Sequence, residues 1–307
     1  LCLKNSKEIS QKIKETALKM GFSGCGIARA RFLTEEELHF KNWLENNHQA
    51  TMKYMENHAE KRLDPKKLVP GATSVISVML NYFPKVKRKK YPKIAKYAYG
   101  EDYHFVMKKM LHSFATKIEK LTGTFEYRVF VDTAPVLEKK WANLAGLGWI
   151  GKNTCLINQQ HGSFFFLGEI ICSLELEYDS PAKNYCGNCT KCIDACPTKA
   201  LTDAYVLNSK KCISYLTIEH KGSFENTVNT KEWLFGCDIC QDVCPWNKRA
   251  IADEHNIFQA IPEIIHMDFN EWQEISEENF NKIFKSSALK RMEYQGLQQN
   301  LQQLANQ

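Results

Sequence analysis

The sequence predicts an α/β (α+β) N-terminal domain, a cysteine-rich module after it, and a short helical C-terminal segment. Helical and strand-like patterns alternate up to about residue 178. Eight of the twelve cysteines then fall between Cys186 and Cys244, and the chain reads helical from Phe258. The expected domains are residues 1–179, 180–250 and 251–307, and a chain of 307 residues is long enough for them.

Helices are predicted from apolar stripes and from end signals. Residues 6–20 and 102–121 carry an apolar residue every three or four positions. Thr34 and Glu37 have the spacing of a capping box, so another helix is expected to begin there. The Gln/Asn-rich tail, residues 295–307, is either a last helix or disordered.

Strands are predicted where apolar and β-branched residues alternate or run together, at residues 23–28, 73–83, 125–131 and 164–176. The third of these strands delivers Asp132 at its end. Pro135 suits the first turn of a following helix, and residues 148–154 form a glycine-punctuated turn.

The charge and hydropathy of the chain bear on its class. Its 41 Lys and Arg against 35 Asp and Glu leave a net charge of only +6, which does not by itself indicate nucleic-acid binding. No apolar run reaches the roughly 18 residues of a membrane span, and neither a secretory signal nor a twin-arginine leader is visible. We therefore expect a cytoplasmic protein with reduced thiols and no membrane contact. No GxGxxG or GxxxxGK[ST] motif indicates a nucleotide site.

The cysteines have the spacing of two iron–sulfur clusters. The segment CGNCTKCIDACP has the C-x2-C-x2-C-x3-C-P run of bacterial ferredoxins, in which the fourth cysteine binds the other cluster. A second, incomplete run, CDICQDVCP, supplies three more cysteines, and Cys212 lies between the two runs. We therefore expect a ferredoxin-like module that holds two [4Fe–4S] clusters.

The eight cysteines divide into two complete ligand sets. One cluster is assigned to Cys186, Cys189, Cys192 and Cys244, and the other to Cys196, Cys212, Cys237 and Cys240. Paired zinc sites are the alternative, because C-x2-C pairs also hold zinc, but the triple run and both Cys-Pro endings favour cubanes. The other four cysteines are expected to be buried core residues; they are Cys2, Cys25, Cys155 and Cys172.

Asp132 stands out among the carboxylates because it follows an apolar strand and precedes Thr133. In an apolar pocket its pKa would be raised, and it would act as a proton donor near neutral pH. The alternative is that Asp132 or Thr133 caps a helix that begins at Pro135. The residues alone favour the cap.

Several segments together resemble one family. They are EKRLDP (60–65), YAYGEDYH (97–104), VDTAPVLEK (131–139), GWIGKNT (148–154), FFFLGEI (164–170), SALKR (287–291) and the two cysteine runs. This combination runs nearly end to end and resembles the epoxyqueuosine reductases, cobalamin-dependent iron–sulfur enzymes that complete queuosine in tRNA. Longer relatives carry a C-terminal helical-repeat extension after SALKR, so we expect this chain to be a short form.

The resemblance implies that the N-terminal domain binds base-off cobalamin and that Asp132 lies beside the cobalt as proton donor. It implies further cofactor contacts from Tyr97, Lys152, Asn153, Ser214, Cys237 and Asp238. Electrons would pass through the two clusters to cobalamin, the epoxide of epoxyqueuosine would be reduced, and Asp132 would protonate the departing oxygen. The implied partners are the anticodon loop of a tRNA and a low-potential donor such as ferredoxin or flavodoxin. A monomer is expected.

A tRNA substrate requires basic contacts. The first candidate is a loop beside the mouth of the cofactor site, with Lys85, Lys87, Arg88, Lys89 and Lys90. The second is the pair Lys210 and Lys211, and a merely solvated surface is the alternative for both. A segment that is commonly basic in the family reads Lys96-Tyr97-Ala98-Tyr99-Gly100 here. Because this segment is less basic and the chain is expected to be the short form, we expect the tRNA to contact mainly the core and residues 250–290.

Two other functions fit parts of the pattern. A reductive dehalogenase shares cobalamin and two clusters, although such enzymes are usually longer and carry a twin-arginine leader. A bare electron-transfer protein would bind the clusters without cobalamin. In that protein Asp132 would be only a helix cap, and its replacement by Asn would leave redox behaviour intact.

Overall fold

A four-stranded antiparallel sheet forms the centre of the N-terminal domain. The computed structural model describes residues 2–222, 224, 229–253 and 257–307. The strand order is β1-β2-β7-β4, and the strands are β1 (Gly24–Arg29), β2 (Ser74–Asn81), β4 (Tyr127–Phe130) and β7 (Phe165–Cys172). All four coincide with predicted strands. Their antiparallel pairing makes this domain α+β.

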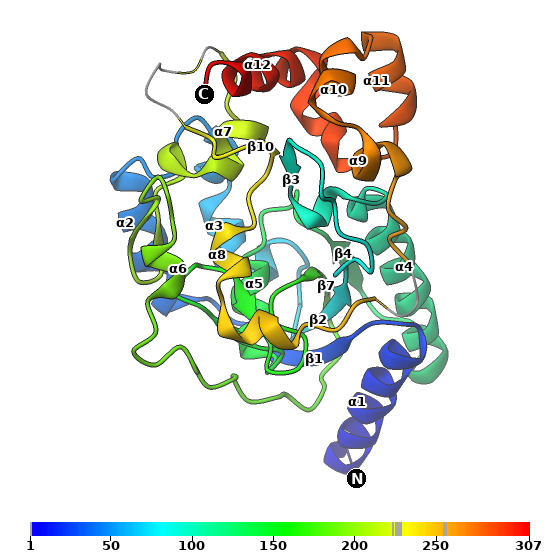
Figure 1. Cartoon of the computed structure of the whole chain (residues 1–307). Helices are drawn as coiled ribbons and strands as arrows, with labels where there is room; N and C mark the ends of the chain where they lie inside the picture. Colours follow the sequence, from blue (N-terminus) through cyan, green and yellow to red (C-terminus); the bar gives the residue numbers. More distant parts are fainter. Residues whose placement is uncertain (1, 223, 225–228, 254–256) are drawn as a thin grey trace.

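Helices cover both faces of the sheet (Figure 1). They are α1 (Cys2–Lys19), α2 (Thr34–Glu45), α3 (Ala59–Leu63), α4 (Tyr103–Thr122) and α5 (Glu138–Leu144). On one face, α1 and α4 share a core with the sheet in which Phe114 and Ile76 are fully buried. On the other face, α5 buries Trp141 in a core that includes Val75. Because successive residues of a strand point to opposite faces, β2 contributes to both cores.

The close approach of the segment after α5 to the sheet requires glycine at one position. A Cβ on Gly26 of β1 would lie 2.0 Å from the backbone oxygen of Ala145. No side chain fits in that space, so Gly26 sets the distance between this layer and the sheet. This layer carries one wall of the functional site described below.

The helix predicted at Thr34 does begin there but lacks the expected capping box, and the helix start predicted at Pro135 is wrong. α2 begins at Thr34 without a side-chain capping bond, because Thr34 is itself the first helical residue. α5 begins at Glu138 rather than at Pro135. Residues between β4 and α5 instead form tight turns, with Thr133 N–H donating to the carbonyl of Val131. Asp132 and Thr133 therefore do not cap this helix, and Asp132 has a left-handed backbone with a φ of 48°.

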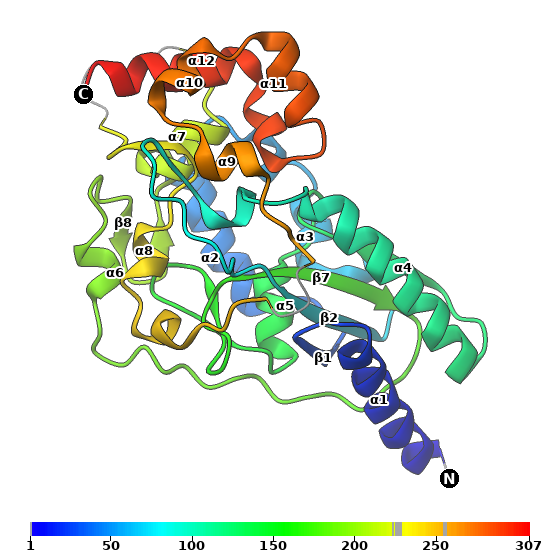
Figure 2. The same cartoon turned by 45° about the vertical axis from the view of Figure 1, so that its right-hand side comes forward.

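The C-terminal helices form a cap over one end of the molecule (Figure 2). They are α9 (Pro262–His266), α10 (Phe269–Glu274), α11 (Glu277–Ile283) and α12 (Glu293–Ala305). The Gln/Asn-rich tail is thus helix α12, which buries Leu297, Leu301 and Leu304. Its Asn300 donates hydrogen bonds to the carbonyls of Thr217 (2.9 Å) and Leu234 (3.0 Å), so the tail is fastened to the cysteine-rich module.

The cysteine-rich module consists of short elements. They are α6 (Lys191–Asp194), β8 (Leu201–Asp203), β9 (Val206–Leu207), α7 (Ile213–Ile218), β10 (Trp233–Phe235) and α8 (Ile239–Asp242). β10 pairs with β3 (Lys93–Ile94), and a hairpin of β5 (Trp149–Ile150) and β6 (Leu156–Ile157) precedes β7. Across the described ranges, no helix has both the length and the apolar character needed to span a membrane.

Candidate active site and cluster sites

A cavity of about 1180 Å³ is lined by residues of both the sheet domain and the cysteine-rich module. Small-ligand pockets are typically about 300–1,000 Å³, so this cavity suits a larger molecule. Four predicted site residues from distant parts of the chain line it: Tyr97, Asp132, Cys212 and Ser214. Ala288, Lys290 and Arg291 of the SALKR motif also line the cavity.

Asp132 lines this cavity from the loop after β4 and contacts a histidine. Its Oδ2 is 3.2 Å from Nε2 of His104, and Nδ1 of His104 is 2.7 Å from Oδ1 of Asp102. Asp102 also caps α4 by accepting a hydrogen bond from the backbone N–H of His104. Glu138 Oε1 accepts a 2.5 Å hydrogen bond from the backbone N–H of Asp132, which holds the loop. The imidazole of His104 therefore lies between two carboxylates.

These contacts decide which groups carry a proton. Burial opposes the charged form of His104, but hydrogen bonds and charges from Asp102 and Asp132 outweigh it and raise the pKa of His104 to about 9. Burial also opposes ionisation of Asp132, but hydrogen bonding to His104 and its charge lower the pKa of Asp132. Burial, with the nearby charge of Asp132, raises the pKa of Glu138 to about 8. At neutral pH an Asp132 carboxylate thus faces a His104 imidazolium.

The pKa of Asp132 is therefore lowered, not raised as it would be in an apolar pocket. The structure instead places a cation next to a side chain that is 52% exposed. His104 and Asp102 were not selected from the sequence, although both lie in the YAYGEDYH segment. In the sequence, a histidine two residues after a helix-capping aspartate is only a weak indication of a catalytic site. Its role becomes visible only because the fold brings Asp132 next to it.

The predicted cluster cysteines fall into two spatial groups, joined internally by charge–charge interactions between thiols. The first group consists of Cys186, Cys189, Cys192 and Cys244, and the second of Cys196, Cys212, Cys237 and Cys240. This grouping coincides with the two ligand sets derived from spacing. Each group therefore fits the donor set of one cubane.

The spacing of the thiols also bears on the zinc alternative. Within the described residues, no three Cys, His, Asp or Glu side chains converge as they do around a single metal ion. A cubane needs no such convergence, because each of its four thiolates binds a different iron. Each group of four thiols is therefore compatible with one cubane.

The two cysteine groups lie in different surroundings. Cys212 lines the cavity, so the second group lies next to it. The first group lies among aromatic rings, where Nε1 of Trp149 is 3.4 Å from Sγ of Cys186. Of the cysteines expected in the core, Cys172 is fully buried in β7 and Cys25 is half-buried, and the side chain of Cys2 lies outside the described residues. Cys155 is hydrogen-bonded to Cys240, beside the second group.

Other predicted cofactor contacts lie outside the cavity lining. Lys152 Nζ donates to the carbonyl of Gly187 (2.8 Å), and Asn153 Nδ2 donates to the carbonyl of Cys240 (3.4 Å). Asp238, next to Cys237, is almost fully buried and accepts hydrogen bonds from the backbone N–H (2.8 Å) and Nζ (3.2 Å) of Lys96. These contacts fasten the cluster module to the sheet domain, and a direct cofactor contact by these residues stays a prediction.

The basic loop at residues 85–90 does not line the large cavity. Arg88 is half-buried and donates to the carbonyls of Pro92 (2.7 Å), Met267 (2.6 Å) and Ile264, so it fastens the loop to the C-terminal helices. The loop borders a second, smaller groove of about 340 Å³ and contributes no residue to the lining of the large cavity. Of the two alternatives offered for this loop, its absence from the lining of the large cavity favours the solvated surface.

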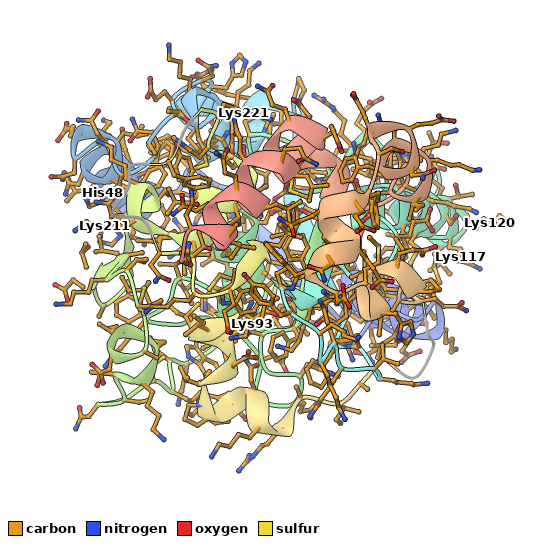
Figure 3. The ribbon with its side chains drawn as sticks, turned by 45° about the horizontal axis from the view of Figure 1, so that its top comes forward. His48, Lys93, Lys117, Lys120, Lys211 and Lys221 are labelled. Atoms are coloured by element: carbon orange, nitrogen blue, oxygen red, sulfur yellow. The ribbon has the colours of Figure 1, made fainter. Side chains whose placement is uncertain are left out.

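The lining of the cavity includes exposed basic and aromatic side chains of its own, here called the rim: Tyr54, Phe105, Lys108 and Lys139. Phe105 is 63% exposed and Tyr54 is 46% exposed. Lys108 and Lys139 form no salt bridge within the part of the chain that the structure describes. Lys210 and Lys211 are also exposed, and the segment that carries them is hydrogen-bonded to His48 (Figure 3).

Comparison with known proteins identifies relatives along the whole chain. Residues 62–133 match the family model "Epoxyqueuosine reductase QueG, DUF1730", and residues 185–247 match a 4Fe-4S double cluster binding domain. The epoxyqueuosine reductase of Cyclobacterium marinum is 50% identical over 305 residues, which is 97% of each chain. Two solved epoxyqueuosine reductases have TM-scores of 0.87 and 0.88, with 28% and 27% identity over 96% of this chain and 80% of theirs. One is bound to an epoxyqueuosine-modified tRNA-Tyr stem loop, and the other, from Bacillus subtilis, has its catalytic aspartate loop swung out of the active site.

A double-cluster domain next to a large cavity with an ionised His–Asp pair defines an iron–sulfur oxidoreductase. A relative that is 50% identical over 97% of each chain shows which family of iron–sulfur oxidoreductases this is. The chain belongs to the epoxyqueuosine reductase family. This confirms the predicted fold class, the two [4Fe–4S] clusters and the activity, which is reduction of epoxyqueuosine to queuosine.

A reductive dehalogenase shares the architecture at a greater distance. The catabolic enzyme NpRdhA has a TM-score of 0.53 and 15% identity, over 96% of this chain and 38% of that chain. A likeness at this identity shows a common fold alone. It gives the dehalogenase alternative no support beyond the fold.

Proposed function

We propose that this chain reduces epoxyqueuosine at the wobble position of tRNA, with electrons from its two [4Fe–4S] clusters and with cobalamin held in the cavity. One observation carries the proposal: Asp132, with His104, and Cys212 of the second cysteine group line the same cavity. Removal of the epoxide oxygen as water consumes two electrons and two protons. The clusters would supply the two electrons, and the His104–Asp132 pair would supply the proton that the departing oxygen takes up first; the second proton of the water would come from solvent.

The cavity fits a large cofactor with broad apolar faces. Its lining combines apolar side chains, among them Met52, Val136 and Leu207, with the polar groups of Tyr97 and Ser214. Cobalamin bound there would supply the low-potential cobalt that breaks the carbon–oxygen bond. Tyr97 and Ser214 are the proposed direct contacts. Lys152, Asn153, Cys237 and Asp238 remain proposed cofactor residues, although they lie outside the cavity lining.

Asp132 and His104 act together as the proton donor. At neutral pH the proton resides on His104, because its pKa is raised to about 9. It passes from Nε2 across 3.2 Å to Oδ2 of Asp132, and from there to the departing oxygen. Asp102 orients the ring by accepting from Nδ1, and Glu138 holds the backbone of Asp132 in place.

The anticodon loop binds at the rim rather than at residues 85–90. Lys108 and Lys139 are free to contact phosphates. The exposed rings of Phe105 and Tyr54 offer faces on which unstacked bases can stack. A tRNA substrate and reduced cluster thiolates also favour a cytoplasmic protein. It acts as a monomer and receives electrons from a low-potential donor such as ferredoxin or flavodoxin.

The test begins with metal content and ends with turnover. Anaerobic purification with cobalamin supplied should give about eight irons per chain, as two cubanes require, together with one cobalt. Mass spectrometry of an anticodon stem loop that carries epoxyqueuosine should then show the loss of one oxygen atom. Iron without retained cobalt would favour the bare electron-transfer protein. Retained cobalt without a change in the stem loop would refute the proposed substrate.

A further inference from the structure

The first cysteine group, which is not the one beside the cavity, has a charged surface of its own. Five exposed residues that lie close to its ligands in the sequence are here called the basic face: Lys183, Tyr185, Lys191, Lys248 and Arg249. Lys191 lies between two ligands of this group in the sequence, and Lys248 and Arg249 follow the ligand Cys244 within one short 3-10 helix. All four cations of the basic face therefore lie within five positions of a ligand of the first group along the chain.

The positive charge of the basic face is not neutralised by the protein itself. Across the described ranges, none of its four cations forms a salt bridge with a carboxylate. The groove near the loop at residues 85–90 differs in this respect. There Lys93 pairs with Glu232 (2.5 Å), and Lys96 pairs with Asp238 (3.2 Å) and Asp242 (2.6 Å). The basic face thus offers uncompensated charge to a negatively charged partner.

Aromatic rings connect the basic face to the thiols. Trp149, which contacts Sγ of Cys186, packs edge-on against Tyr185 and Trp246 with ring centroids 5.2 and 5.0 Å apart. The guanidinium of Arg249 lies 5.7 Å from the centre of the Trp246 ring. Tyr185 is 46% exposed. Tyr, Trp and Arg are the residues that most often dominate protein–protein binding energy.

We propose that the basic face docks an acidic, low-potential electron-carrier protein. The inference rests on the proposed function and deepens it by naming the surface at which the electron donor binds. In each encounter the carrier loses one electron and the cluster of the first group gains it, and two encounters supply one turnover. Electron transfer between proteins weakens steeply with distance, so the carrier must approach partly exposed thiols. The basic face meets this need, and none of its residues lines the large cavity at whose rim we propose that the tRNA binds.

The experiment uses the cluster-loaded protein and a flavodoxin of net negative charge as the probe. The variant combines Lys191→Glu with Lys248→Glu. The matched control combines Lys117→Glu with Lys120→Glu, two exposed positions on α4 that lie far from the cluster module (Figure 3). At low ionic strength the Kd for flavodoxin should rise about tenfold or more in the variant, because steering and complementarity are both lost. The control should match the unsubstituted protein, and dithionite-driven turnover of the stem loop should be unchanged in both.

The outcomes separate this inference from the proposed function. An unchanged Kd for flavodoxin in the variant would overturn the inference. A weaker affinity for the tRNA stem loop with unchanged affinity for flavodoxin would overturn it too, by assigning the face to nucleic acid. Failure of dithionite-driven turnover in the unsubstituted protein would refute the proposed function, while the flavodoxin Kd would still decide the docking. If the variant loses iron, the test is made instead on the unsubstituted protein, whose Kd for flavodoxin is measured from about 20 to about 300 mM salt. A Kd that stays constant over this range would overturn the inference.

Discussion

The position of His104 between Asp102 and Asp132 makes the stability of the protein depend on pH. The pKa of His104 is raised from 6.5 to about 9, and its side chain is 19% exposed. A difference of this size corresponds to about 3 kcal/mol of stabilisation of the folded state. Because the folded pKa lies above the unfolded one, this stabilisation is complete below about pH 6.5 and is lost as the pH rises through about 9. We predict that His104→Gln removes this loss.

The assay is urea unfolding of the cluster-loaded protein under argon, followed by circular dichroism at about pH 6 and about pH 9.5. Gln keeps an amide near Asp132 but does not ionise. The unfolding free energy of the unsubstituted protein should fall by about 3 kcal/mol more across this window than that of the variant. Glu138, whose pKa is also raised, adds to the pH dependence of both proteins, so the test compares the two proteins rather than the pH dependence of one alone. Equal pH dependence of the two proteins would refute the reasoning.

The remaining predictions concern the catalytic loop, the rim, the basic loop and the sheet. Asp132→Asn should retain about eight irons and the cobalt yet lower turnover by about 100-fold or more; unchanged turnover would remove Asp132 as the proton donor. Lys108→Gln with Lys139→Gln should lower the salt slope of tRNA binding by about 1.5, whereas the same change at Lys87 and Lys89 should not; the opposite result would restore the basic loop as the tRNA contact. Arg88→Met should lower the unfolding free energy by about 2–3 kcal/mol, because three carbonyls lose a charged donor, without altering that salt slope. Gly26→Ala should destabilise the protein by about 1–3 kcal/mol because of the backbone oxygen 2.0 Å from its new Cβ; unaltered urea unfolding would contradict this.

The features that were predictable from the sequence are those encoded over a few neighbouring residues. The strands at β2 and β7 follow from long runs of apolar and β-branched residues, which need no knowledge of the partner strand. The double-cluster module follows from cysteine runs whose short spacers carry the geometry of the cubane. Helix ends were less certain. The helix at Thr34 lacks its predicted capping box, and α5 begins at Glu138 rather than at Pro135, because a capping sequence competes with the tight turns and tertiary contacts around it.

The sequence by itself determined the class of cofactor module and the strands of the central sheet, because both are written in local spacing. Only the tertiary structure decided the chemistry of Asp132. Folding brings His104 from α4 to within 3.2 Å of Asp132 after β4, and it lowers the pKa of Asp132, which an apolar pocket would raise. It also placed Arg88 among backbone carbonyls instead of at a tRNA surface. The physical reason is common to both: the environment of a charge is set by groups that are distant along the chain and adjacent only after folding.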